Sequence, residues 1–336
     1  MHDMSVIDLP RLASPFDLRD RDSYQRWRAW KLAHAPRAAE DLLVEVGDPA
    51  RLSGAERAAL LTCIARCNVA VYRLRGRPGG DAAAGVAKQQ ASVQALGAQL
   101  GLHRLDANWL AEEDGISQIT VKAAEGDARA GDGAAFIPYT DRAIRWHTDG
   151  YYHPRERRIH AMILHAVRPA QEGGVNRLLD HELAYIALRD EEPALVRALM
   201  HPQAMTIPAR LGAAGEARAA QSGPVFSVTP GVDGRPALHL RYTARTRSIV
   251  WREDPLTQAA AARLLALLDA PACAGRVTLR LDAGMGIVGH NLLHDRSAFR
   301  DDPAAPRLLL RARYLDRCSP VPDQDNTAKD MPWRNG

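Results

Sequence analysis

Two side chains that can bind a metal ion stand close together within an aromatic run, Trp146-His147-Thr148-Asp149-Gly150-Tyr151-Tyr152. In an extended segment, residues i and i+2 point to the same side, so the imidazole of His147 and the carboxylate of Asp149 can converge on one ion. These two groups and a second histidine make the facial triad of non-haem Fe(II) sites, which leaves the opposite face of the octahedron open. A His-x-Asp pair often arises by chance, so this interpretation depends on a second histidine downstream.

Two histidines in one downstream segment are candidates for the third ligand. Residues 286–299 read Gly-Ile-Val-Gly-His-Asn-Leu-Leu-His-Asp-Arg-Ser-Ala-Phe. We expect a strand over residues 286–293, and the even spacing of His290 and His294 puts both on one face of it. Spacing alone therefore leaves both histidines open as the distal ligand.

Arginines recur at even spacing on the last strand that the sequence predicts, over residues 307–315. Arg307, Arg311 and Arg313 would then share one face. Three like charges on a strip that faces a barrel interior are costly without anions to receive them, which favours contact with anionic ligands. The alternative is that this face points outward and that all three side chains are solvated.

Together these motifs resemble those of the taurine dioxygenase (TauD/TfdA) family of Fe(II)/2-oxoglutarate-dependent oxygenases. The resemblance covers residues 116–315 and is carried by Trp146–Asp149, Gly173-Gly174, Leu293–Phe299, and Arg307 with Arg311. It implies that His147, Asp149 and His294 bind Fe(II), since the Leu-His-Asp-Arg-Ser-Ala-Phe context favours His294 over His290. It further implies that 2-oxoglutarate takes two of the remaining positions on iron and that oxygen takes the last.

The resemblance assigns the distal carboxylate of 2-oxoglutarate to Arg307, which follows His294 by 13 residues. A guanidinium suits this role because it meets a carboxylate in a bidentate fork. The family often has Asp-Thr after the paired glycines, whereas Val175-Asn176 stands here, and the amide of Asn176 could donate to the co-substrate instead. Members also often carry Asn five residues before the distal histidine, whereas Asn291 stands three before it.

A count of charges predicts an anionic substrate. Fe(II), Asp149 and 2-oxoglutarate together leave one negative charge, Arg307 neutralises it, and Arg311 then has no partner. A buried guanidinium cannot shed its proton, so a substrate carboxylate, sulfonate or sulfate would neutralise Arg311. Two alternatives stay open: Arg311 pairs with Asp180 or Glu182, or it shares 2-oxoglutarate with Arg307. Further candidate substrate residues are Tyr151, Gln118, Lys122 and Arg241.

The expected activity is that of a dioxygenase that uses Fe(II), 2-oxoglutarate and oxygen to hydroxylate or otherwise oxidise a small organic substrate, with release of succinate and carbon dioxide. The carboxylate of Asp149 argues against the halogenase members of the family, which lack it. A zinc-dependent hydrolase or isomerase on a cupin-like barrel could use the same three ligands, but it would not need a carboxylate anchor such as Arg307. A catalytically silent binding module is the third interpretation, and the intact triad argues against it.

Composition is that of an ordinary globular protein and narrows the choice of partners. Of 336 residues, 46% are hydrophobic and 25% are charged, and the net charge is +4. No basic run with interleaved aromatics predicts nucleic-acid binding, no apolar run approaches the length of a membrane span, and the N-terminus lacks the layout of a signal peptide. The four cysteines form no Cys-x-x-Cys pair, so we expect reduced thiols and a cytoplasmic enzyme. The sequence leaves homo-oligomerisation open.

Short strands separated by glycine and proline turns, with helices around them, predict an α+β, mainly β fold with a double-stranded β-helix (jelly-roll) core. We expect residues 1–105 to form a helix-rich region packed on the barrel, residues 106–318 the catalytic core, and residues 319–336 a polar tail. Helices are predicted at 22–35, 53–67, 82–100, 181–200 and 255–268, and a polar insert at 212–223. The small, polar residues 123–135 predict a loop that could act as a lid.

Overall fold

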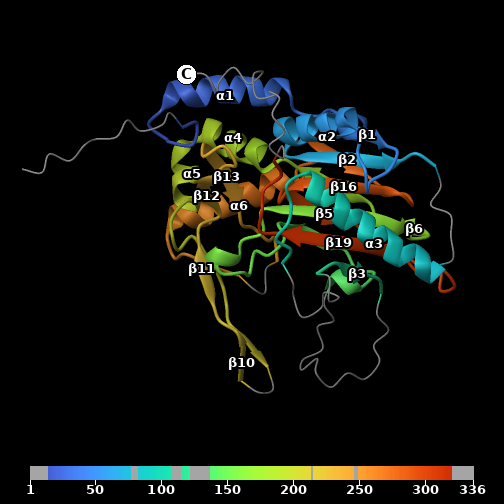
Figure 1. Cartoon of the computed structure of the whole chain (residues 1–336). Coiled ribbons are helices and arrows are strands. Elements are labelled where there is room, and N and C mark those ends of the chain that lie inside the picture. Colours follow the sequence, from blue (N-terminus) through green and yellow to red (C-terminus); the bar gives the residue numbers. More distant parts are fainter. Residues whose placement is uncertain are drawn as a thin grey trace, which may run out of the picture.

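The computed structural model describes residues 14–76, 82–106, 115–121, 137–212, 215–245 and 249–319. Within these residues the strands build a six-stranded sheet, a four-stranded sheet and smaller groups (Figure 1). The larger sheet has the order β1 (Leu43–Val46), β2 (Val69–Leu74), β16 (Met285–His290), β5 (Ala161–Arg168), β19 (Leu308–Tyr314), β3 (Ser117–Ile119). The smaller has the order β15 (Arg276–Leu279), β7 (Asn176–Leu179), β17 (Leu293–Arg296), β4 (Ile144–His147). The fold is thus a mixture of helices and sheets, as expected.

One face of each main sheet borders a shared apolar core. That core joins residues of the larger sheet with residues of the smaller one: Met162, Leu164, Ile287 and Leu309 with Leu178, Val277 and Leu279. Paired residues of neighbouring strands lie on the same face of a sheet. Arg311 pairs with Leu164, and Leu178 pairs with His294, so both polar side chains belong to the faces that meet in this core.

Helices cover the other face of each sheet. The larger sheet packs against α2 (Gly54–Cys67) and α3 (Ala82–Gln99), which lie beside β2, β16, β5 and β19 in Figure 1. The smaller sheet packs against α1 (Arg21–Ala33), α4 (His181–Glu191), α5 (Pro193–Leu199) and α6 (Pro255–Asp269). Local signals start two of these helices: Ser53 and Glu56 form the capping box of α2, and Asp254 caps α6 ahead of Pro255.

The helix predicted over residues 181–200 is two helices. Glu192 has the extended backbone angles φ −159° and ψ 117°, and α5 begins at Pro193 directly after it. Proline has no N–H to donate and restricts the residue before it to extended conformations. Pro193 therefore ends α4 and starts α5, and the prediction of one helix was wrong.

Most of the described residues in the polar insert predicted at 212–223 lie in strands, which the sequence did not indicate. The strand β9 (Arg210–Gly212) pairs with β10 (Gly215–Arg218), and β11 (Gln221–Gly223) pairs with β8 (Met205–Ile207), which also pairs with β14 (Val250–Trp251). A further hairpin joins β12 (Phe226–Pro230) to β13 (Pro236–Leu240). Hairpins of polar residues give little hydrophobic periodicity, which explains the miss.

The strand predicted over residues 286–293 is divided between the two sheets. The strand β16 ends at His290, the chain turns through Asn291 and Leu292, and β17 begins at Leu293 in the smaller sheet. The backbone N–H of Asn291 donates to the carbonyl of His160, and that of Leu292 donates to the carbonyl of His290. The two candidate histidines therefore lie in different sheets, and the expectation that they share one strand face was wrong.

The paired glycines lie at and directly after the end of a short strand. The strand β6 (Glu172–Gly173) pairs with β18 (Phe299–Arg300). Gly173 has φ +73°, and a Cβ there would stand 2.3 Å from the carbonyl oxygen of Ala298, so only glycine fits. A Cβ on Gly174 would lie 3.8 Å from Nε of Arg307, which shows how near this turn lies to that guanidinium.

The N-terminal region contributes to the larger sheet as well as packing on it, because β2 hydrogen-bonds to β16. The boundary at residue 105 stays a prediction. The lid predicted at 123–135 and the tail after Ser319 lie outside the described residues. Among the helices of the described ranges, none combines the length and apolar character that crossing a bilayer requires. All four cysteines are free thiols.

Candidate active site

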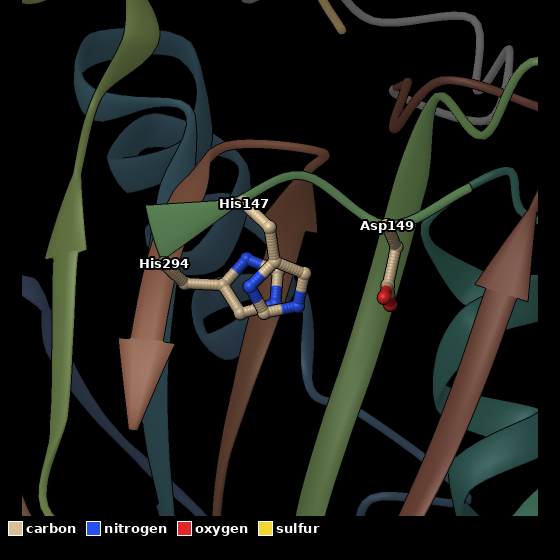
Figure 2. Close-up of side chains that lie close together, drawn as sticks. All are labelled: His147, Asp149 and His294. Carbon is tan, nitrogen blue, oxygen red and sulfur yellow. The ribbon is translucent and has the colours of Figure 1, made fainter. Parts of the chain in front are cut away.

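The side chains of His147, Asp149 and His294 meet at one point between the sheets. Their candidate ligand atoms all lie within 4.8 Å of one another, and Figure 2 shows the three side chains directed into a common space. His147 ends β4 and pairs across the sheet with His294 on β17, which sets the two ring centroids 4.2 Å apart. Asp149 lies two residues after His147, and its carboxylate is near the same point, as expected for residues i and i+2 of an extended segment.

Backbone carbonyls fix the orientation of both imidazoles. Nδ1 of His147 lies 3.0 Å from the carbonyl oxygen of Arg145, and Nδ1 of His294 lies 3.0 Å from that of Leu292. A carbonyl only accepts, so each Nδ1 carries the proton and each Nε2 keeps its lone pair for a metal. Burial, with the neighbouring His294, lowers the pKa of His147 to about 3, so this ring is neutral at physiological pH, as a metal ligand must be.

Asp149 is held from both sides and keeps one oxygen without a partner. Its backbone N–H donates to Oδ1 of Asn291 at 2.8 Å, while Nδ2 of Asn291 donates to the carbonyls of Asp149 at 2.7 Å and Ile159 at 3.0 Å. Burial opposes its charge, but the surrounding groups, first Arg311 and then Arg313, together outweigh burial and lower the pKa. Oδ1 lies 3.4 Å from Nη1 of Arg311, and Oδ2 is buried without a hydrogen-bond partner in the described part of the chain. A buried ionised oxygen next to two imidazole nitrogens fits a divalent cation.

Arg307 is a buried cation without a carboxylate on its guanidinium among the described residues. Its side chain lies 4.9 Å above the ring of Phe299, and only its backbone N–H reaches Asp301, at 3.0 Å from Oδ1. Burial lowers its pKa to about 10, while Asp301 acts in the opposite direction. Asn176 is buried and donates to the carbonyl of Gly174 at 3.3 Å, on the turn beside Arg307. These groups fit the carboxylate anchor expected from the sequence.

The three arginines of the last strand differ in their surroundings. Arg307 precedes β19, whereas Arg311 and Arg313 lie within it and face the core. Arg313 already has an internal anion, since it donates to Asp106 at 2.7 Å and to the hydroxyl of Tyr152 at 3.1 Å. The expectation that all three serve external ligands is therefore wrong for Arg313.

For two positions, the rival residues contact other groups. His290 ends β16 in the larger sheet, and its Nδ1 lies 2.7 Å from Oδ1 of Asn68. Among the described residues, His290 belongs to no group of side chains that could hold a metal ion. The acids proposed as partners of Arg311 bind another residue: Lys31 lies 2.6 Å from Asp180 and 2.5 Å from Glu182.

The other candidate substrate residues fall into three groups. Gln118 pairs with Leu310, whereas Ser117 pairs with Arg311, so Gln118 points to the helix-covered face and its assignment was wrong. Lys122 lies outside the described residues. Tyr151 and Arg241 line a cavity of about 290 Å³ that also reaches Asp149.

Two polar residues that support the site were not identified as such from the sequence. Asn291 ties the Asp149 segment to β16, and its only signal was an amide within an apolar run. The carboxylate of Asp106 pairs with both Arg313 and Arg157, the latter at 2.6 Å. No local sequence pattern indicated this role of Asp106.

Comparison with known proteins places the chain among iron oxygenases. Residues 37–313 match the family described as "Taurine catabolism dioxygenase TauD, TfdA family". Uridine-5'-phosphate dioxygenases from an Amycolatopsis species and a Streptomyces species are 31% and 34% identical, over 51% and 53% of this chain and 60% and 64% of their own lengths. The chain therefore spans less than two thirds of these curated relatives.

Solved structures share the fold at low sequence identity. A taurine dioxygenase from Burkholderia xenovorans has a TM-score of 0.51 and 19% identity, covering 81% of this chain and 87% of its own. The non-heme iron oxygenase OrfP, in complex with Fe and alpha-ketoglutaric acid, has a TM-score of 0.53 and 17% identity, covering 88% and 89%. No finding supports the zinc hydrolase alternative.

Proposed function

Because the chain belongs to the TauD/TfdA family of dioxygenases, we propose that it is an Fe(II)- and 2-oxoglutarate-dependent dioxygenase that oxidises a small anionic organic substrate. The observation that carries the proposal is the convergence of the ligand atoms of His147, Asp149 and His294 within 4.8 Å, with Oδ2 of Asp149 left without a hydrogen-bond partner among the residues that the structure describes. Three ligands leave half of an octahedron for other molecules.

Each buried group then has a task. His147, Asp149 and His294 would hold the iron, with the Nδ1 bonds to backbone carbonyls keeping both imidazoles in the ligating tautomer. Arg307 would receive the distal carboxylate of 2-oxoglutarate, with the amide of Asn176 nearby. When bound, iron and 2-oxoglutarate supply the oxidation of a substrate C–H bond by oxygen, with succinate and carbon dioxide as products.

The fold belongs to the same proposal in its finer description. We take the two facing sheets to be the halves of a double-stranded β-helix. The shared core and the passage of the chain from β16 to β17, one sheet to the other, support this interpretation. A cytoplasmic location and a homo-oligomeric state remain predictions from the sequence.

The anionic substrate has two kinds of support. The curated relatives are named for uridine 5'-phosphate, a small anion. The side chain of Arg311 also lies at the site and is 12% exposed, and its Nη1 lies 3.4 Å from Oδ1 of Asp149. A metal ion on that carboxylate would compete for its charge, leaving Arg311 available to a substrate anion or to 2-oxoglutarate.

The test is a turnover screen on the anaerobically loaded enzyme. Oxygen uptake and succinate should be measured with Fe(II), 2-oxoglutarate and a panel of sulfonates, carboxylates, amino acids and nucleoside monophosphates. We expect 2-oxoglutarate-dependent turnover with an anionic member of the panel. Turnover that needs zinc and proceeds without 2-oxoglutarate would refute the proposal, and a neutral or cationic substrate would refute its anionic part.

A further inference from the structure

A cationic cavity adjoins the segment that carries the candidate metal ligands. It has a volume of about 290 Å³ and is lined by Asp149, Gly150 and Tyr151 on one side. Arg155, Arg158 and Arg241 line the same space. The first two follow Tyr151 closely in the chain, at either end of a short 3-10 helix, and Arg241 comes directly after β13.

These three arginines have no anion of their own in the described part of the chain. Neither Arg155 nor Arg158 has an ion pair or a side-chain hydrogen bond there, whereas Arg157 between them binds Asp106 at 2.6 Å. Arg241 donates only to backbone carbonyls, including those of Tyr151 and Gln221, each at 2.8 Å. The single acid among the lining residues is Asp149, whose carboxylate contacts Arg311.

Burial and like charge both oppose the charged forms of Arg158 and Arg241. Burial, and then Arg158, lowers the pKa of Arg241 to about 10. Burial, and then Arg155, lowers the pKa of Arg158. Gly223 leaves room for this arrangement, because a Cβ there would stand 3.2 Å from Nη1 of Arg241. Arg155 is exposed, Arg158 is half-buried and Arg241 is buried. Buried guanidinium groups that no acid among the described residues neutralises are costly unless an anion joins them.

Neutral donors complete the lining. Ser222, Ser227 and Gln221 border the cavity beside the arginines, and hydroxyl and amide groups can donate to oxyanions. The volume lies at the small end of ligand-binding pockets, roughly 300–1,000 Å³. It suits an oxyanion group of a ligand better than a whole extended ligand.

We propose that this cavity, through Arg155, Arg158 and Arg241, binds the phosphate group of a small phosphate monoester that is the substrate. The assignment rests on the proposed dioxygenase function and moves the main substrate anion contact from Arg311 to this cluster. Asp149 and Tyr151 belong both to the cavity wall and to the metal-ligand segment. A phosphate held here would therefore anchor the substrate beside the metal-ligand segment while leaving Arg307 to 2-oxoglutarate.

Binding should be measured by anaerobic calorimetry on the full chain loaded with Fe(II) and 2-oxoglutarate. The probes are uridine 5'-monophosphate, uridine and inorganic phosphate. We expect the monophosphate to bind at least about 10-fold more tightly than uridine, and inorganic phosphate to compete with it, since uridine lacks the charged group that the arginines would contact.

The double variant Arg155→Gln/Arg158→Gln should weaken the monophosphate by roughly 10- to 100-fold and leave the affinities for uridine and 2-oxoglutarate unchanged. Arg263→Gln is the matched control, because it removes an exposed arginine of α6 that pairs with Glu191 at 2.6 Å. The control should bind all probes like the wild type.

Three other outcomes separate the possible failures. Binding of inorganic phosphate that depends on the two arginines, without binding of the monophosphate, supports an oxyanion site but overturns the substrate assignment. Equal affinities of the double variant and the wild type for both phosphates overturn the site itself. If the visible band of the anaerobic Fe(II)–2-oxoglutarate complex fails to form in the wild type, the dioxygenase function fails, whereas a normal band without phosphate binding refutes only the cavity.

Discussion

Replacing Arg307 by leucine should have opposite effects on the protein with and without 2-oxoglutarate. The side chain is 5% exposed and its guanidinium has no ion pair among the described residues. Leucine removes this buried charge, so we expect the free Arg307→Leu protein to be at least as stable as the wild type. Loss of the charge-assisted contact with the co-substrate costs about 3–5 kcal/mol, so the affinity for 2-oxoglutarate should fall ~10²–10³-fold.

Thermal unfolding measures both effects in one experiment. A ligand at 100 times its Kd stabilises the wild type by about 2.7 kcal/mol. For a chain of 336 residues the entropy of unfolding is about 0.7 kcal/mol/K, so 2-oxoglutarate should raise the Tm of the anaerobic Fe(II) protein by about 4 °C. At the same concentration a variant with a 100-fold higher Kd gains only about 0.4 kcal/mol, which is well under 1 °C.

The control is Arg300→Gln, which removes an exposed arginine next to the same Phe299. Arg300 pairs with Glu172 at 2.6 Å and lies on β18, away from the core. Its variant should keep the full rise in Tm. If Arg307→Leu also keeps the rise, or if the free variant loses several kcal/mol, Arg307 is a structural residue and the anchor assignment is refuted.

Three further perturbations test the metal centre and its support. His294→Ala should abolish the visible band of the anaerobic Fe(II)–2-oxoglutarate complex while His290→Gln retains it, and the reverse result would return the distal position to His290. Asn291→Ala removes hydrogen bonds to the backbone around the candidate ligands and should lower iron affinity about 10–100-fold in a chelator competition; an unchanged affinity would show that the segment is rigid without this amide. Asp180→Asn removes one of the two carboxylates that pair with the buried amine of Lys31. It should lower the free energy of unfolding, measured in urea at pH 7, by about 3–5 kcal/mol. Burial opposes the charge of Asp180, but Lys31, His181 and the backbone N–H of Glu182 together outweigh burial and lower the pKa. This stabilisation is therefore present above the unfolded pKa of about 3.9 and is lost as pH falls through the lower folded value. The difference between the Asp180 variant and the wild type should therefore shrink in acid, and a difference independent of pH would contradict the ion pair.

Features that depend on nearby residues could be predicted from the sequence. The capping box at Ser53 and the Asp-Pro start of α6 each specify a helix end within four residues. The convergence of His147 and Asp149 follows from the two-residue period of an extended chain. These signals are local, so no knowledge of the rest of the fold was needed.

Features that depend on strand register could not be predicted in the same way. Whether Gln118 faces the core or the helices is decided by its pairing with Leu310 on β19, far away in the sequence. A shift of one residue would have reversed the outcome. The contacts of Asn291 with Asp149 are of the same kind, because a turn between two sheets must first bring them together.

The pairing of β4 with β17 has a consequence for the order in which the enzyme is made. His147 and His294 are separated by nearly half the chain and become neighbours only when these two strands join. Pairings between distant segments close large loops and form slowly. A nascent chain on the ribosome therefore carries the His147–Asp149 pair without its third ligand until His294 has been made and β17 has paired with β4. Once bound, the ion would link the two strands directly and slow their separation.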